Sequence, residues 1–212
     1  MPPYEQRQLQ PSAAPTPSAA PSAAPALPSD MLVEVLDAQR RVVAVLPAAD
    51  VARQKLSHRA VAILIFDDQG RLSLRRNDNA GQPGHERWDV PVREPVLVGE
   101  SVQDAATRAL KAALGIHAER LRPLLELEAQ PENGNEFLHV FSLTRAEGQP
   151  SAAPSSATLG WATDKAEHEP GEYCFTTEEL GCLMRDFREL VSPRFLLLAE
   201  ALNLKGLWRR RP

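Results

Sequence analysis

The 212-residue chain lacks the features that mark several large classes of protein. Aromatic residues make up only 5% of it, and no uninterrupted apolar run approaches the ~18 residues of a membrane-spanning helix. Its two cysteines, Cys174 and Cys182, are too few for a disulfide framework and lack the paired spacing of a metal site. We therefore expect two reduced thiols in a cytoplasmic protein.

An excess of positive charge is also missing, since the net charge is −4. The one dense basic run, residues 209–211, stands at the end of the sequence, where a solvated charge is the simpler role. Without a basic stripe, binding to nucleic acid is not expected. The first residues have neither the basic start nor the apolar centre of a signal peptide, which again predicts a cytoplasmic location and no membrane association.

Proline, in contrast, is plentiful and unevenly spread. Eight of the 19 prolines lie in residues 1–30, where the unit Pro-Ser-Ala-Ala-Pro recurs, and the same unit returns at 150–154. Such segments cannot bury enough apolar surface to offset the entropy of ordering them. We expect a disordered tail over 1–30, one folded domain over 31–208 and an inserted surface loop over about 147–159. A spacer is the simpler role for these segments, and docking of a proline-recognising partner is the alternative.

The folded part has the apolar patterning of alternating strands and helices. Strands are expected at 31–37, 41–46, 59–66, 71–76, 123–129 and 136–144, and helices at 47–54, 101–114, 176–187 and 193–204. Ser101 is a natural N-cap, and Gly115 is a natural helix stop. Residues 77–88 lack periodicity and are expected to form a loop. Strands before and around helices imply an α/β or α+β sandwich.

Residues 94–116 contain a recognisable frame. The residues in register with it are Glu100, Arg108, Leu110, Gly115 and Ile116. This frame resembles the Nudix box, and the chain is most similar to the branch that includes isopentenyl-diphosphate isomerase and hydrolase-like relatives. Further likenesses to the family are His58, Arg59, Ala60, Gly70, Arg75, Arg76 and Trp88. The resemblance implies an α/β/α sandwich with a mixed β-sheet, and cleavage of diphosphate linkages with Mg²⁺ or Mn²⁺ held by carboxylates of one helix.

The departures from the family's pattern fall on its metal ligands. The box has glutamates where this chain has Ala109, Ala112 and Ala113, and a glycine where it has Glu94. From their spacing, the three alanines are expected to share one helix face. Alanine cannot ligate a hard cation, yet it is the best helix former, so a degenerate Nudix box with an intact helix is expected. Within it, Glu100 and Arg108 are expected to form a structural ion pair.

Glu100 and Glu136 remain candidates for a displaced metal site. Glu136 and His58 match positions where isomerase-like members carry metal ligands, although a solvated charge or a hydrogen-bonded edge residue is the simpler role for each. Arg93 stands at the position of the isomerase's catalytic cysteine, and Pro95 replaces a nearby histidine ligand. Isomerase activity is therefore not expected.

Two functions are compatible with these residues. One is an active Nudix hydrolase of nucleoside diphosphate derivatives that uses a displaced site for Mg²⁺ or Mn²⁺. The other, which the three alanines favour, is a pseudoenzyme whose catalysis is weak or lost and which binds a phosphorylated small molecule or a protein. Arg75, Arg76 and Arg93 are the candidates for contacting phosphate oxygens without a metal, and surface solubility is the alternative role for them.

Overall fold

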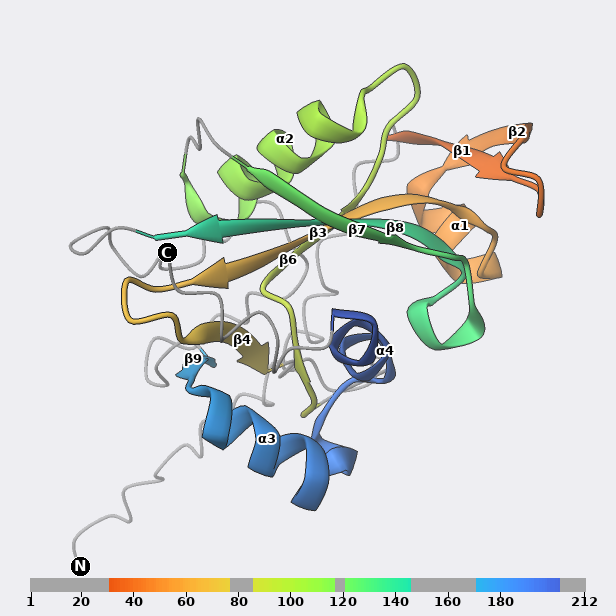
Figure 1. Cartoon of the computed structure of the whole chain (residues 1–212). Coiled ribbons are helices and arrows are strands. Elements are labelled where there is room, and N and C mark those ends of the chain that lie inside the picture. The colour runs from red at the N-terminus through yellow and green to blue at the C-terminus, as the bar shows by residue number, and fades with distance from the viewer. Residues whose placement is uncertain (1–30, 77–85, 117–120, 146–170, 203–212) are drawn as a thin grey trace, which may run out of the picture.

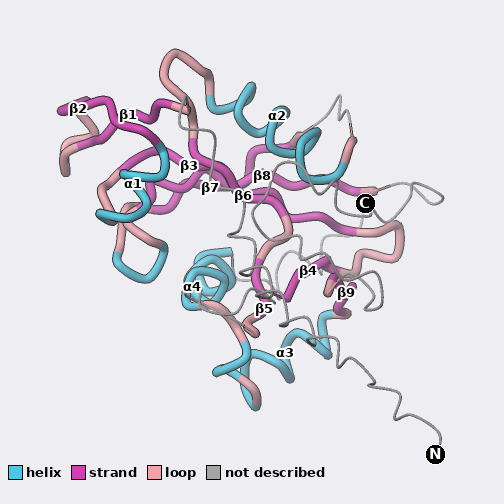
Figure 2. Tube along the Cα trace, turned by 180° about the vertical axis from the view of Figure 1, so that it is seen from behind, coloured by secondary structure: helices cyan, strands magenta, loops and turns pink. Residues whose placement is uncertain are grey.

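The computed structural model describes residues 31–76, 86–116, 121–145 and 171–202. Within these ranges a mixed sheet of nine strands forms the centre. Helix α2 (Val102–Leu114) covers one face, and α3 (Thr177–Asp186) and α4 (Pro193–Leu202) lie on the other (Figure 1). The view from behind in Figure 2 shows the same layers, which confirms the predicted α/β/α sandwich. The predicted tail over 1–30 and the predicted insertion over 147–159 lie outside the described residues.

The centre of the sheet is strand β3, which pairs with four neighbours. The strands are β1 (Leu32–Leu36), β2 (Val42–Pro47), β3 (His58–Phe66), β4 (Leu72–Arg76), β5 (Trp88–Asp89), β6 (Val92–Pro95), β7 (Arg122–Leu127), β8 (Glu136–Thr144) and β9 (Glu172–Phe175). Strands β1, β4 and β6 run antiparallel to β3, and β8 runs parallel to it, with His58 opposite Glu136. This register brings the first residues of β3 and β8 side by side.

Alternation along β3 separates two apolar clusters. Ala60, Ala62 and Leu64 belong to the cluster shared with α3 and α4. Val61, Ile63 and Ile65 belong to the cluster under α2. Because residue 93 pairs with Ala62 and residue 94 with Val61, the side chains of Arg93 and Glu94 lie on opposite faces of the sheet. A third cluster joins β1 to α1 (Ala48–Gln54).

The caps of α2 agree with the sequence. Ser101 Oγ accepts a hydrogen bond from the Asp104 N–H at 3.1 Å and donates one to Asp104 Oδ2 at 2.6 Å. Gly115 ends the helix with φ of 64°, a left-handed conformation that glycine adopts without strain. Thr176 and Glu179 form a capping box at the start of α3. None of the helices in the described ranges is long and apolar enough to cross a membrane.

Three strands were not predicted. β5 and β6 have two and four residues, too few for an alternating pattern to be visible, and Trp88 begins β5 instead of ending a loop. β9 is held through its pairing with β4. Two short 3₁₀ helices, η1 (Pro131–Asn133) and η2 (Arg188–Leu190), were also missed. β7 ends at Leu127, two residues before the predicted end, and the next carbonyl, that of Glu128, accepts from the Asn133 side chain.

Candidate functional site

The loop before α2 is held by the predicted ion pair. Arg108 donates from Nε to Glu100 Oε1 at 2.8 Å and from Nη2 to Oε2 at 2.9 Å, and Nη2 also donates to the Pro95 carbonyl at 2.8 Å. Partial burial raises the pKa of the Glu100 carboxyl, but the hydrogen bonds from Arg108 and from the Leu97 N–H outweigh it and lower the pKa overall. Glu100 and Arg108 therefore connect the end of β6 to α2, as expected.

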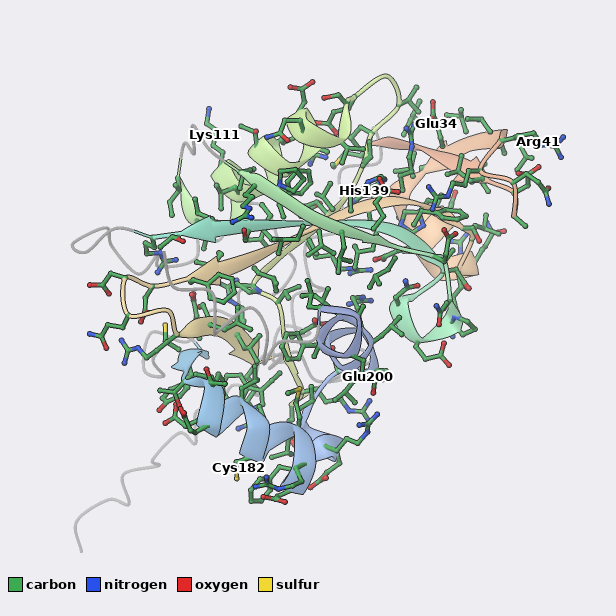
Figure 3. The ribbon with its side chains drawn as sticks, in the orientation of Figure 1. Glu34, Arg41, Lys111, His139, Cys182 and Glu200 are labelled. Carbon is green, nitrogen blue, oxygen red and sulfur yellow. The ribbon has the colours of Figure 1, made fainter. Side chains whose placement is uncertain are left out.

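The helix offers no oxygen ligand at the family's metal positions. Ala109 and Ala113 are 0% and 4% exposed and pack in the cluster under α2, whereas Ala112 is partly exposed. The expected common face is therefore split, and the neighbouring Lys111 extends from α2 away from the sheet (Figure 3). No three His, Cys, Asp or Glu side chains in the described ranges lie close enough together to hold an ion. The side chains that the structure describes therefore do not fit Mg²⁺ or Mn²⁺.

A buried carboxylate occupies the position of the box's first glycine. Glu94 is buried on the α2 face of β6. Burial raises its pKa, and the charges of Arg108 and Arg93 oppose that rise. One carboxylate of this kind, beside a Glu100 that Arg108 already holds, is not a ligand set for a divalent cation.

On the α4 face, four charged side chains form what we call the arginine–carboxylate cluster: Arg93, Glu136, Arg194 and Asp89. Arg93 donates through both Nε and Nη2 to the two oxygens of Glu136, with an Nε–Oε2 distance of 2.8 Å. Arg194, in α4, donates to Asp89 Oδ2 at 3.0 Å, and its Nε lies 3.9 Å from Glu136 Oε2. Burial and the Arg194 charge lower the pKa of Arg93 to about 9, which leaves Arg93 charged at neutral pH. Two cations thus face two anions.

A tight turn positions Glu136 for this role. The buried Asn133 accepts from the Glu136 N–H at 3.1 Å and donates to the Glu136 carbonyl at 3.0 Å. Gly134 has φ of 78°, and a Cβ there would lie 3.5 Å from Arg194 Nη2 and 3.6 Å from Glu136 Oε1. Glycine is favoured at 134 by its backbone conformation, because the two distances to the charged groups are ordinary van der Waals contacts that a Cβ could make.

His58 lies at the edge of the cluster as a neutral base. Its Nδ1 is 2.8 Å from the Leu56 carbonyl, so Nδ1 carries the proton, and Nε2 is 3.8 Å from Glu136 Oε1. Burial lowers its pKa, the Leu56 hydrogen bond partly opposes this, and the charges of Arg93 and Arg194 lower it further.

Several sequence-based roles need correction. The structure brings His58, Arg93 and Glu136 together, and Glu136 is only 2% exposed, so a solvated surface charge is wrong for Glu136 and for His58. The hydrogen bonding that was the other expectation for them is confirmed, through Arg93 for Glu136 and the Leu56 carbonyl for His58. Sequence reasoning missed Asp89 and Arg194. Nothing local marks them, because one lies in a two-residue strand and the other in an apolar helix.

The three candidate phosphate-contacting arginines do not form one group. Arg93 is bound to Glu136. Arg75 is buried, with its Nη2 3.6 Å from Glu172 Oε2. Arg76 is exposed, with its Nη2 3.5 Å from Glu86 Oε1. Surface solubility is therefore wrong for Arg75 and stays a prediction for Arg76, which is exposed.

The two thiols belong to the C-terminal elements. Cys174 is in β9, and burial raises its pKa. Cys182 is on α3, on the side of the helix away from the sheet (Figure 3). Both are unpaired and partly exposed. Neither contributes to the arginine–carboxylate cluster.

The state of His58 predicts how stability depends on pH. Its pKa in the folded protein is below the ordinary 6.5. As pH falls through about 6.5, the unfolded chain therefore binds a proton at this residue that the folded protein does not bind. We expect the free energy of unfolding, measured by urea denaturation, to be lower at pH 5.5 than at pH 7.5. His58→Gln is expected to reduce that difference. An unchanged pH dependence in His58→Gln would show that the folded protein accepts this proton.

Comparisons with known proteins agree with this architecture. The family model of the NUDIX domain matches residues 56–197. An isopentenyl-diphosphate Δ-isomerase of Serratia proteamaculans (strain 568) is 29% identical over 164 residues, which are 68% of this chain and 86% of that protein. An uncharacterized Nudix hydrolase of Pseudomonas aeruginosa, PA4841, is 34% identical over 93 residues, 43% of this chain and 54% of that protein.

Solved structures show the same fold. DR0079 from Deinococcus radiodurans superposes with a TM-score of 0.62 at 19% identity, over 81% of this chain and 98% of that one. The MutT protein from Methanosarcina mazei Go1 gives a TM-score of 0.50 at 16% identity, over 69% of this chain and 93% of that one. At such identities the likeness shows the fold alone. Since the family model covers more than half of the sequence, the chain belongs to the Nudix family.

Proposed function

We propose that this Nudix protein binds a phosphate-bearing small molecule and hydrolyses it weakly or not at all. The observation that carries the proposal is the identity of residues 109, 112 and 113, all alanine in a helix that is otherwise well formed. Two of the three, Ala109 and Ala113, are packed in the core, so apolar side chains fill the positions where a Nudix hydrolase has metal ligands. The two cysteines of the protein form no disulfide with each other, which supports a cytoplasmic location.

The expected loss of rate is large. A divalent cation stabilises the charge that develops on a transferring phosphoryl group, and removing its direct ligands forfeits several kcal/mol of that stabilisation. Each ~1.36 kcal/mol is tenfold in rate, so hydrolysis is expected to fall by about 10³-fold or more.

A displaced metal site is the alternative, and its two candidate residues already have other partners. Glu100 accepts two hydrogen bonds from Arg108, and Glu136 accepts two from Arg93. A cation at either position would have to displace a bidentate arginine, which supports binding over catalysis.

A protein partner is the second candidate for the ligand. The observation in its favour is strand β2, which pairs with β1 alone among the described strands and exposes Val42, Val43 and Val45. Apolar side chains on an edge strand are a common basis for association with another chain.

The Serratia relative's isomerase reaction is not proposed for this chain. In the isomerases a cysteine stands at the position of Arg93, and here the guanidinium is bound to Glu136. An arginine whose pKa is about 9 and which is bound to a carboxylate is a poor donor or acceptor of protons at carbon at neutral pH.

Hydrolysis and binding are measured together to test the proposal. We expect nucleoside diphosphate derivatives to bind the purified protein, with Mg²⁺- or Mn²⁺-dependent turnover below ~10⁻³ s⁻¹, and binding to persist when EDTA removes the metal. Turnover of about 1 s⁻¹ or faster would contradict the proposal, as would the absence of binding to every compound.

The same preparation is expected to leave isopentenyl diphosphate unchanged. Stereospecific deuterium exchange into that compound would show that a different group replaces the isomerase cysteine.

A further inference from the structure

A second charged cluster, the Arg75–Arg145 site, consists of Arg75, Arg145, Glu172 and Ser73. The β4–β9 register places Arg75 opposite Glu172. Arg145 follows the last residue of β8, and its N–H donates to the Phe66 carbonyl at 2.7 Å. The arginine side chains are each 11% exposed and that of Glu172 is 4% exposed. Three charges are thus buried where β4, β8 and β9 meet.

This site is incomplete, unlike the arginine–carboxylate cluster. Arg75 Nη2 is 3.6 Å from Glu172 Oε2, and Arg145 Nη2 is 3.8 Å from Oε1, both too long for hydrogen bonds. Ser73 Oγ donates to Glu172 Oε1. Four buried atoms in the described ranges have no hydrogen-bond partner: Arg75 Nη2, Arg145 Nε, Arg145 Nη2 and Glu172 Oε2. Two guanidinium groups against one carboxylate leave an excess charge of +1.

The neighbouring carboxylate does not supply the missing charge. Asp89 stands opposite Arg75 in the β4–β5 register. Its Oδ2, however, accepts from Arg194 and its Oδ1 from the Val90 N–H. Among the described residues, the Arg75–Arg145 site therefore keeps an excess positive charge, and a buried charged donor without a partner is costly.

The unsatisfied atoms define the ligand that would complete the site. The guanidinium N–H groups require acceptor oxygens on an anion. Glu172 Oε2 accepts only, so it requires a hydrogen-bond donor. A phosphate monoester with one proton has both, because its second pKa is near 6, whereas a sulfate ion has no proton to donate.

We propose that Arg75 and Arg145 bind the singly protonated terminal phosphate of a ligand without a metal, and that Glu172 accepts the hydrogen bond from its P–OH group. This inference rests on the proposed function and identifies where the phosphate is held. It replaces the grouping of Arg75 with Arg76 and Arg93, because Arg145 supplies the second guanidinium.

The test uses the full chain at pH 6 in phosphate-free, low-salt buffer, with inorganic phosphate, methyl phosphate and sulfate as probes. Calorimetry is expected to show binding of both phosphates and at least about tenfold weaker binding of sulfate. Arg145→Gln is expected to weaken phosphate binding by about tenfold or more. Arg122→Gln, at an exposed position in β7, is the matched control and should bind like the native chain.

Two further readouts separate a ligand site from a structural ion pair. Because the Arg145 guanidinium is incompletely paired, Arg145→Gln should keep or raise the Tm without phosphate, whereas a structural role predicts a lower Tm. Glu172→Gln should reduce the preference for phosphate over sulfate, since its amide N–H can donate to a sulfate oxygen.

Equal binding of phosphate and sulfate by the native chain would overturn the role of Glu172. An Arg145→Gln variant that binds phosphate as tightly as the native chain would overturn the assignment of phosphate to this site. Binding of nucleoside diphosphates by the same variant would still support the proposed function. If no phosphate compound binds the native chain, the proposed function fails as well.

Discussion

Replacing Glu136 with alanine is expected to destabilise the folded protein by about 3–5 kcal/mol. Glu136 is 2% exposed and accepts from Arg93, while Arg194 lies 3.9 Å away. Without the carboxylate, Arg93 loses its close partner and two guanidinium groups face each other with Asp89 alone to balance them. Urea denaturation measures the loss, and thermal denaturation should show a Tm lower by about 6 °C or more.

Glu132→Ala is the matched control for this prediction. Glu132 is an exposed carboxylate in the adjacent η1 turn, and its removal should change the free energy of unfolding by less than about 0.5 kcal/mol. Arg93→Met combined with Glu136→Met is expected to recover much of the loss, because an apolar pair leaves less buried charge unbalanced. A loss below about 1 kcal/mol in Glu136→Ala would show that the cluster is more hydrated than its burial suggests.

Replacing Ala109 with glutamate is expected to disrupt the packing of α2 against the sheet and not to restore a metal site. Ala109 is 0% exposed between α2 and the sheet, so a carboxylate there must be desolvated or must push α2 outward. We expect Ala109→Glu to lower stability by about 3 kcal/mol or more, measured by urea denaturation. Ala112→Glu, at a partly exposed position on the same helix, is the control and should cost less than about 1 kcal/mol.

The triple variant Ala109→Glu, Ala112→Glu, Ala113→Glu tests the same point through activity. Since positions 109 and 113 are both in the core, the variant is expected to be destabilised in Mg²⁺ as well as without it. A stable triple variant that gains Mg²⁺-dependent hydrolysis would contradict this expectation. Such a result would show that the rest of the hydrolase site is intact and lacks only its ligands.

The sequence alone was sufficient for the features that depend on near neighbours. Helix α2, its Ser101 cap and its Gly115 stop follow from residues within one or two turns of each other. The Glu100–Arg108 pair could also be predicted, since only the first two turns of α2 separate its members. The three alanines that remove the metal ligands are visible without any structure.

Tertiary structure decided which charged residues meet. Arg194 and Asp89 are 105 residues apart, and the packing of α4 against β5 brings them within 3.0 Å. The parallel pairing of β3 with β8 places His58 beside Glu136, and β9 brings Glu172 to Arg75. Local patterns show which residues of one strand share a face of the sheet, but they do not show which distant strand pairs with it. The register of the sheet is set by long-range packing. The balance of charge in each cluster therefore emerged only from the fold.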